Sequence, residues 1–441
     1  MDRAVFGRGR GLRGELTVPG DKSISHRAVM LGAIAEGETH AAGFLHGADC
    51  LSTIQCLRAM GAEIRLSPDE TELWIRGRGL RGLRRPEVAL DCGNSGTTMR
   101  LLSGILAAQD FSVRLTGDES IQRRPMRRIT EPLSEMGAEI RSVRGNGCAP
   151  LLIEGRTLHG IRYRSPVASA QVKSALLFAG LYAGGATTIE EPFLSRDHSE
   201  RMLQAMGASV DSRIFPDGRA VITVQPTEVL CAPEGILQIP GDISSAAYFL
   251  TAALLLPDSE LLLRNVGVNP TRDGILRVYR SMGAEIRIEN LQCSGGEEIA
   301  DLRVCSSKLY GTEISGALIP ALIDELPVIA AAAALSEGTT VIRDAAELKV
   351  KESNRIFAMC EGLRRLGIDA AETEDGMVIH GKGSRRGLHS AVVESFGDHR
   401  IAMSFAVLGL CMEAGGSVMI RNADCIRISF PGFFERLESF G

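Results

Sequence analysis

A short phrase returns six times along this 441-residue chain and constrains its fold more than any other feature. The first copy reads Leu57-Arg-Ala-Met-Gly-Ala-Glu-Ile64, and the marker glycines of the six copies are Gly61, Gly137, Gly207, Gly283, Gly367 and Gly441. Successive copies therefore lie 70 to 84 residues apart. That period is too long for a helical solenoid repeat, so we expect six α/β units.

Each copy is typical of the end of an amphipathic helix. Leu51, Ile54, Leu57 and Met60 recur every three residues before the first marker glycine. The glycine is expected just beyond the helix, where it can adopt a left-handed conformation. The alternating residues 62–66 that follow predict a strand.

A second type of helix alternates with the first. Its six starts are expected near Lys22, Asn94, Ser169, Ile243, Asp324 and Asp398. Residues 246–256 and 328–335 are apolar on every side, which predicts helices surrounded by protein. Both runs are too short to span a bilayer.

Two similar segments suggest how the six units are divided. Val18-Pro-Gly-Asp21 resembles Ile239-Pro-Gly-Asp242, with three repeats between them and three after the second. We interpret them as hinges, near 19–21 and 240–242, between a first domain (1–20 and 241–441) and a second domain (21–240). Two ordinary turns would explain the Pro-Gly pairs equally well.

Composition excludes several classes of protein. Lys and Arg number 49 against 54 Asp and Glu, a net charge of -5, and aromatic residues make up 5%, so no nucleic-acid partner is expected. The ten cysteines form no metal-spaced cluster, which favours a reducing compartment. Residues 1–16 lack the apolar core of a signal peptide. We therefore expect a cytoplasmic protein with no membrane partner.

Unusual polar residues begin the apolar helices, where free N–H groups and the helix dipole attract anions. In the first half these starts, at 21–27, 92–98 and 169–173, carry hydroxyls, amides and cations. In the second half, at 241–246, 324–325 and 397–400, they carry carboxylates and an Asp-His-Arg run. One half is thus suited to hold a phosphate, and the other to add acid–base groups.

Each motif also has a structural interpretation. Residues 93–98 could be a capping loop, and the four arginines within 123–128 either a solvated turn or a carboxylate clamp. The ordinary structural interpretation of residues 349–355 is an exposed helix start. The run 398–400 directly precedes an apolar segment and would need polar partners if buried.

Together these residues resemble the enolpyruvyl transferase family, nearly end to end. Seven motifs occur in order: PGDKSISHR from Pro19, GNSGTTMR from Gly93, RRPM from Arg123, SAQVKSA from Ser169, PGDISSAAY from Pro240, KESNR from Lys351 and GDHRIAMS from Gly397. The resemblance implies two similar α/β domains joined by two hinge strands. Each domain would contain three βαβαββ repeats with the helices buried.

The resemblance also implies a reaction. The closest branch of the family transfers the enolpyruvyl group of phosphoenolpyruvate to the 5-hydroxyl of shikimate 3-phosphate, a step of aromatic amino-acid biosynthesis. A tetrahedral ketal phosphate forms and then loses phosphate. No metal or organic cofactor is implied, and two self-contained domains permit a monomer.

Site residues carry over from the matching motifs. Shikimate 3-phosphate would contact Lys22, Ser23, Arg27, Ser169, Gln171, Ser195, Asp324 and Lys351. Phosphoenolpyruvate would contact Lys22, Asn94, Gly96, Arg124, Gln171, Arg355 and Arg400. The 21–240 domain would be the shikimate 3-phosphate side, and the other domain would supply the phosphoenolpyruvate side and the carboxylates.

The reaction needs two groups that handle protons. We expect Asp324 to act on the substrate hydroxyl and Glu352 on the methylene, with Lys22, Asp398 and His399 supporting catalysis. Carboxylates among many cations have depressed pKa values, so Glu352 needs partial burial to act as an acid.

Some positions depart from part of the family: Ala170, His198, Glu347 and Ile428 stand where some members have Ser, Tyr, Asn and Lys. These leave the reaction intact but affect the expected contacts. A methyl group at Gly96 would crowd the phosphoenolpyruvate pocket, so the native glycine predicts sensitivity to glyphosate.

Two rival functions were weighed. Family members that use UDP-N-acetylglucosamine normally have Lys-Asn at the first helix start and a Cys near the Arg-Pro motif. This chain has Lys22-Ser23, and residues 117–130 contain no Cys. A non-catalytic phosphometabolite-binding relative would usually have lost one of Asp324, Lys351, Glu352 or Arg400, all of which are present.

Overall fold

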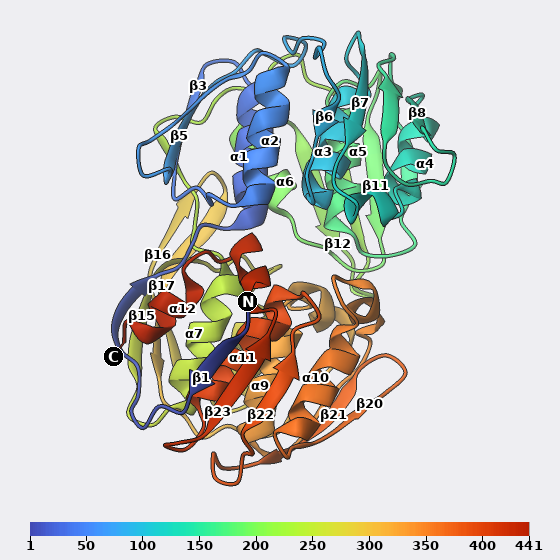
Figure 1. Cartoon of the computed structure of the whole chain (residues 1–441). Coiled ribbons are helices and arrows are strands. Elements are labelled where there is room, and N and C mark those ends of the chain that lie inside the picture. Colours follow the sequence, from blue (N-terminus) through green and yellow to red (C-terminus); the bar gives the residue numbers. More distant parts are fainter. Residues whose placement is uncertain (441) are drawn as a thin grey trace. The chain divides into compact units, whose positions relative to one another are not determined.

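The computed structural model describes residues 1–440, which divide into two compact units (Figure 1). Unit 1 comprises residues 1–19, 241–292 and, as far as the structure describes the chain, 298–440; unit 2 comprises Gly20–Pro240 and Cys293–Glu297. Residues 293–297 lie inside the 241–441 segment of the sequence-based division but belong to unit 2. The chain therefore passes between units at four points rather than at two.

Unit 2 contains three four-stranded sheets. Their strand orders are β14 (Ile236–Gln238), β3 (Glu38–Ala42), β5 (Glu72–Arg76), β4 (Glu63–Leu66); β6 (Leu90–Asp91), β7 (Ser112–Thr116), β9 (Leu151–Glu154), β8 (Glu139–Ser142); and β10 (Arg162–Arg164), β11 (Thr187–Glu191), β13 (Ala220–Val224), β12 (Val210–Ile214).

Three further sheets are built around unit 1. Their orders are β16 (Ile286–Ser294), β17 (Glu297–Cys305), β15 (Glu260–Gly267), β2 (Arg13–Thr17); β18 (Glu313–Ile314), β19 (Glu337–Ile342), β21 (Met377–Lys382), β20 (Asp369–Glu372); and the three-stranded β1 (Arg3–Phe6), β23 (Ser417–Arg421), β22 (Ala391–Glu394). The tip between β16 and β17 is the segment assigned to unit 2.

The same pairing recurs in every sheet. A first strand pairs in parallel with a second, as β10 does with β11, and the remaining strands pair antiparallel, as β11 does with β13. In four of the six sheets a buried helix connects the two parallel strands, because parallel neighbours need a crossover connection. The predicted α/β fold of repeated βαβαββ units is confirmed, although the sheet of β1, β23 and β22 has three strands instead of four.

Two repeats exchange their first strands. β2 precedes helix α1 (Lys22–Ile34) in the chain, yet it pairs in parallel with β15 of unit 1. β14 precedes helix α7 (Ile243–Leu255), yet it pairs in parallel with β3 of unit 2. The two Pro-Gly segments follow β2 and β14 and carry this exchange.

The predicted buried helices are α1, α3 (Gly96–Leu106), α5 (Ala170–Gly180), α7, α9 (Leu326–Leu335) and α11 (His399–Leu410). Every residue of α9 is buried. In unit 1, α7, α9 and α11 pack against one another, and in unit 2, α3 packs against both α1 and α5. Each unit thus has its own helical core, and no helix within residues 1–440 is both long and apolar enough to cross a membrane.

The other helix type is α2 (Ala48–Ala59), α4 (Arg127–Glu135), α6 (His198–Ala205), α8 (Gly274–Ser281), α10 (Arg355–Arg365) and α12 (Phe433–Glu438); four short 3-10 helices cover Ile121–Arg123, Gly316–Ala321, Ala346–Val350 and Ala423–Ile428. The marker glycines after α2 to α10 have φ between 80° and 97°. That conformation closes a helix and suits glycine, as predicted. The sixth marker, Gly441, lies outside the described residues.

Candidate active site

Polar residues cap the buried helices at the predicted starts. The side chain of Asp21 accepts a hydrogen bond from the Ile24 N–H, and that of Ser95 accepts one from Thr98. Ser169, Asp242 and Asp398 cap α5, α7 and α11 in the same way. Five of the six buried helices thus begin with a capping side chain, at the kind of position where anions are stabilised, whereas α9 has no such cap.

The start of α1 places two cations in unit 2. Lys22 forms an ion pair with Asp49, a residue of α2 that the sequence reasoning did not select. Burial raises the pKa of Asp49, but the attraction of Lys22 outweighs it and holds the pKa below its usual value. The buried Arg27 donates to the Ser23 carbonyl at 2.9 Å and to the hydroxyls of Ser174 and Ser199, each at 2.7 Å.

A second group surrounds Gly96 at the start of α3. Arg124 donates to the Asn94 side-chain oxygen at 2.6 Å. Gln171 accepts from Arg100 at 2.7 Å and donates to the Thr97 hydroxyl at 3.2 Å. The structure thus brings Asn94, Gly96, Arg124 and Gln171 into one neighbourhood.

Arg100 belongs to this group although the sequence reasoning did not name it. Its side chain is buried, and within residues 1–440 no carboxylate forms an ion pair with it. Burial, together with the repulsion of the nearby Arg128 and Arg124, lowers its pKa to about 9. A buried guanidinium group close to two further arginines favours a bound anion.

Ser169 and Ser195 share one partner, Glu191, at the end of β11. The Glu191 carboxylate accepts from the Ser169 N–H at 2.9 Å, from the Ser195 N–H at 3.2 Å and from the Ser195 hydroxyl at 2.8 Å. Two predicted phosphate-binding residues from different elements are therefore held by the same buried side chain.

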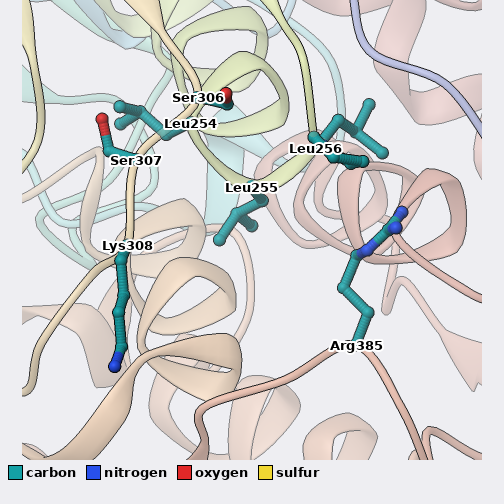
Figure 2. A pocket seen from close by; sticks show the side chains of 8 residues that line it. Leu254, Leu255, Leu256, Ser306, Ser307, Lys308 and Arg385 are labelled. Carbon is teal, nitrogen blue, oxygen red and sulfur yellow. The ribbon is translucent and has the colours of Figure 1, made fainter.

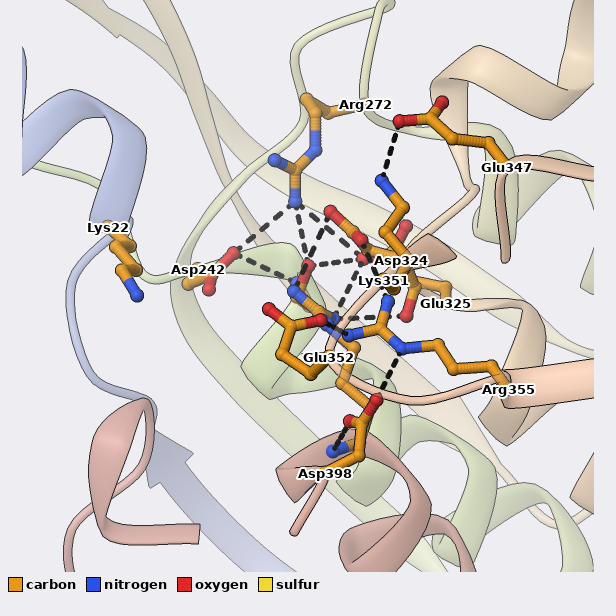
Figure 3. Close-up of polar contacts among 12 residues, drawn as sticks. Lys22, Asp242, Arg272, Asp324, Glu325, Glu347, Lys351, Glu352, Arg355 and Asp398 are labelled. Carbon is orange, nitrogen blue, oxygen red and sulfur yellow. Dashed lines mark hydrogen bonds and ion pairs between the residues drawn. The ribbon is translucent and has the colours of Figure 1, made fainter. Parts of the chain in front are cut away.

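In unit 1, Arg355 joins three predicted site carboxylates (Figure 3). Its guanidinium donates to Glu352 at 2.6 Å, to Asp398 at 2.8 Å and to Asp324 at 3.2 Å. Burial lowers the pKa of Arg355, but these carboxylates, Asp398 first, raise it overall. Arg355 therefore stays charged inside the protein.

Arg400, at the start of α11, approaches one of these carboxylates, that of Asp324. It donates to the Asp324 carbonyl at 3.0 Å, and its guanidinium lies 3.7 Å from the Asp324 carboxylate and 3.8 Å from Glu325. Burial, followed by the repulsion of Arg400, lowers the pKa of the adjacent His399 to about 3. His399 is therefore neutral at pH 7.

Glu352 is ionised in this structure. Burial raises the pKa of its carboxyl, but the attraction of the Arg355 guanidinium outweighs burial and brings that pKa down to about 2. Its side chain is 41% exposed, so it can reach a bound molecule. The burial that an acid would need is thus outweighed by a cation.

Four positions carry a residue that differs from that of some family members, and the structure shows the neighbours of each. Glu347 pairs with Lys351 at 3.0 Å, and the buried His198 contacts Glu297 at 2.8 Å. Ala170 is the first residue of α5, and Ile428 ends a 3-10 helix with 40% of its surface exposed. Glu347 therefore competes with any ligand for Lys351.

A hollow of about 280 Å³ in unit 1 lies among different residues (Figure 2). It is lined by Leu254–Pro257, Ser306–Lys308 and Arg385, and it contains none of the predicted site residues. Within residues 1–440, no group of His, Cys, Asp and Glu side chains is arranged to hold a metal ion.

Comparison with known proteins identifies the family of this chain. The profile of the EPSP synthase (3-phosphoshikimate 1-carboxyvinyltransferase) family matches residues 7–437. The 3-phosphoshikimate 1-carboxyvinyltransferases of Desulforudis audaxviator and Geobacter sp. strain M21 are 55% and 52% identical, covering 98% and 99% of this chain and 97% and 99% of their own. A solved EPSP synthase from Acinetobacter baumannii is similar with a TM-score of 0.90 at 44% identity, covering 100% of this chain and 98% of its own.

Proposed function

Since this chain belongs to the EPSP synthase family, we propose that the polar helix starts of its two units bind the two substrates of that family's reaction. The enzyme transfers the enolpyruvyl group of phosphoenolpyruvate to the 5-hydroxyl of shikimate 3-phosphate. Addition gives a tetrahedral ketal phosphate, and elimination of phosphate gives 5-enolpyruvylshikimate 3-phosphate. This is a step of the shikimate pathway.

Unit 2 supplies most of the groups for shikimate 3-phosphate in this proposal. Lys22, Ser23, Arg27, Ser169, Gln171 and Ser195 would bind it, together with Asp324 and Lys351 of unit 1. A phosphate accepts hydrogen bonds, and this set offers three cations, hydroxyls and an amide, several of them at helix N-termini.

Phosphoenolpyruvate carries both a phosphate and a carboxylate, so it needs several cations. We assign Lys22, Asn94, Gly96, Arg124, Gln171, Arg355 and Arg400 to it, and we add Arg100. The support for Arg100 is that it is buried beside Gly96, bonded to Gln171, and lacks a carboxylate partner in the described part of the chain.

The acid–base assignment rests on one observation, the contact of Arg355 with Asp324, Glu352 and Asp398. In the proposal, Asp324 accepts the proton of the 5-hydroxyl while Glu352 gives a proton to the methylene carbon. Elimination then returns a proton from the methyl group to Glu352. Asp398 and neutral His399 hold Arg355 and Glu352 in place.

Glu352 must first take up a proton, because Arg355 keeps its pKa near 2 in the free protein. An anionic substrate on Arg355 and Arg400 would compete with the carboxylates for those guanidinium groups. The same substrate would add negative charge and exclude water, and both effects raise the pKa of a carboxyl. Binding of phosphoenolpyruvate would thereby raise the pKa of Glu352, so that this carboxyl can take up the proton that it later donates.

Phosphate release tests the reaction directly. Purified protein is given phosphoenolpyruvate with shikimate 3-phosphate, with UDP-N-acetylglucosamine, or alone. We expect release only with shikimate 3-phosphate. Release only with the sugar nucleotide would identify the other branch of the family, and binding of both substrates without any release would identify a non-catalytic relative.

We also propose that the protein acts as a monomer in the cytoplasm. Each unit has its own core, and all ten cysteines are free thiols, as is usual in a reducing compartment. Sedimentation at micromolar concentration would test the first statement, since a dimer would sediment at twice the 47.3 kDa mass of the chain.

A further inference from the structure

Lys173 is a lysine placed inside an apolar helix. It lies in α5 among Val172, Ala175 and Leu176, and its side chain has no exposed surface. Its ammonium group lies 3.0 Å from Glu191 and 2.7 Å from Glu200, and it donates to the Ser195 carbonyl at 3.0 Å. A fully buried lysine cannot touch a substrate, so any functional role must pass through its neighbours.

Burial alone would lower the pKa of Lys173, but Glu200 and Glu191 outweigh it and raise that pKa. The lysine is therefore charged. Glu191 connects Lys173 to the proposed site, because its carboxylate also accepts hydrogen bonds from Ser169 and Ser195. Such a buried ion pair costs desolvation energy and is weak support for stability by itself.

The Ser195 hydroxyl must change partners when a phosphate binds. It has one proton, which it donates to Glu191 in this structure. A phosphate dianion only accepts hydrogen bonds, so Ser195 can bind it only by turning that proton away from Glu191. Glu191 would then keep the Ser169 N–H, the Ser195 N–H and Lys173 as partners.

We propose that Glu191 and Lys173 are positioning residues that present Ser169 and Ser195 to the phosphate of shikimate 3-phosphate. Glu191 fixes the backbone of both serines, and Lys173 compensates the Glu191 charge when the Ser195 hydroxyl turns to the substrate. This inference rests on the proposed function, which places both serines on that phosphate.

The test separates a role at the phosphate from a role in the fold. Calorimetric titration measures the affinities of Glu191→Gln for shikimate 3-phosphate and for shikimate, which lacks the phosphate. We expect the affinity for shikimate 3-phosphate to fall about tenfold, since hydrogen bonds to charged groups are lost. The affinity for shikimate and the KM for phosphoenolpyruvate should not change.

Glu190→Gln is the matched control. Glu190 is the preceding residue of β11, but its carboxylate contacts Arg162 at 2.6 Å and Arg219 at 3.8 Å instead of the serines. This variant should bind shikimate 3-phosphate like the wild type. If Glu191→Gln does not fold, Glu191→Asp keeps a charge beside Lys173 but draws the carboxylate back from the serines, and the same selective loss is expected.

Ser195→Ala distinguishes this inference from the proposal beneath it. A loss of shikimate 3-phosphate affinity in Ser195→Ala but not in either Glu191 variant would overturn the positioning role and leave the proposed site intact. No loss in Ser195→Ala would overturn the phosphate assignment and the positioning role with it. An equal loss for shikimate and its phosphate would make Glu191 a structural residue only.

Discussion

The Arg355 guanidinium donates to the Glu352 carboxylate at 2.6 Å, and this contact determines the protonation state of Glu352. The two residues lie three positions apart, at the start of α10, so the local chain brings them together. Arg355 is held in turn by the fully buried Asp398. In the free protein Glu352 is thus a carboxylate that contacts Arg355, the cation that we assign to phosphoenolpyruvate.

This contact makes a prediction about stability and pH. The pKa of Glu352 in the fold, about 2, lies below its unfolded value of about 4.3. The ionised form therefore stabilises the fold fully above pH 4.3, and that stabilisation is lost as the pH falls toward 2. We expect Glu352→Gln to have a lower Tm than the wild type at pH 7, and the difference to shrink at pH 3.5.

Calorimetry at both pH values measures this difference. Its size will be modest, since Glu352 is 41% exposed and solvent screens the pair. Glu374→Gln is the control, because Glu374 is exposed and forms no ion pair within residues 1–440. A difference in Tm between Glu352→Gln and the wild type that grows in acid would contradict the depressed pKa.

A second prediction concerns Gly96→Ala. The added Cβ would lie 2.6 Å from Arg100 Nη1 and 3.6 Å from Arg124 Nη1. The Arg100 guanidinium must then move and weaken its bond to Gln171. We expect the KM for phosphoenolpyruvate to rise about tenfold, inhibition by glyphosate to weaken, and the KM for shikimate 3-phosphate to change little.

Steady-state kinetics with and without glyphosate provide the measurement. Gly185→Ala is the control within unit 2, because a Cβ there meets nothing within 4 Å and the backbone needs no left-handed conformation. Unchanged glyphosate inhibition in Gly96→Ala would refute the steric argument.

A third prediction separates binding from stability at Lys22. Lys22→Met should raise the KM for both substrates and leave the largely buried Asp49 without its cation. Burial then raises the pKa of Asp49, so the variant loses stability at neutral pH and regains it in acid, where Asp49 is protonated. We expect a fall in Tm of about 2–4 °C at pH 7.

The double variant Lys22→Met/Asp49→Asn is informative because it removes the unpaired charge. Its Tm should return toward that of the wild type, while both KM values stay high. Recovery of the KM values along with Tm would show that Lys22 acts on the fold rather than on the substrates.

Much of the fold was predictable from the repeat. The marker glycines located the ends of α2 to α10, since a left-handed residue after a helix is a local requirement. The apolar run 328–335 likewise identified the buried helix α9. The exchange of β2 and β14 was not predictable, because a strand's own residues do not specify which parallel neighbour it pairs with.

The candidate site also contains residues that could be predicted from the sequence and residues that could not. Motif residues at helix starts could be selected because helix N-termini bind anions. Asp49, Arg100 and Glu191 were missed, since each looks like an ordinary charged residue until the fold gives it a partner. Lys173 could have been selected from the sequence, because it lies inside an apolar helix. A buried charge of this kind needs a group of opposite charge beside it.

If Glu352 supplies the proton to the methylene carbon, as we propose, its loss must slow formation of the tetrahedral intermediate in a single turnover. Excess Glu352→Gln is mixed with both substrates and quenched within milliseconds, and the tetrahedral ketal phosphate is quantified, with Glu374→Gln as control. We expect the variant to bind both substrates but to form the intermediate at least about 100-fold more slowly than the wild type. Formation at the wild-type rate would contradict the assignment of Glu352 as the acid.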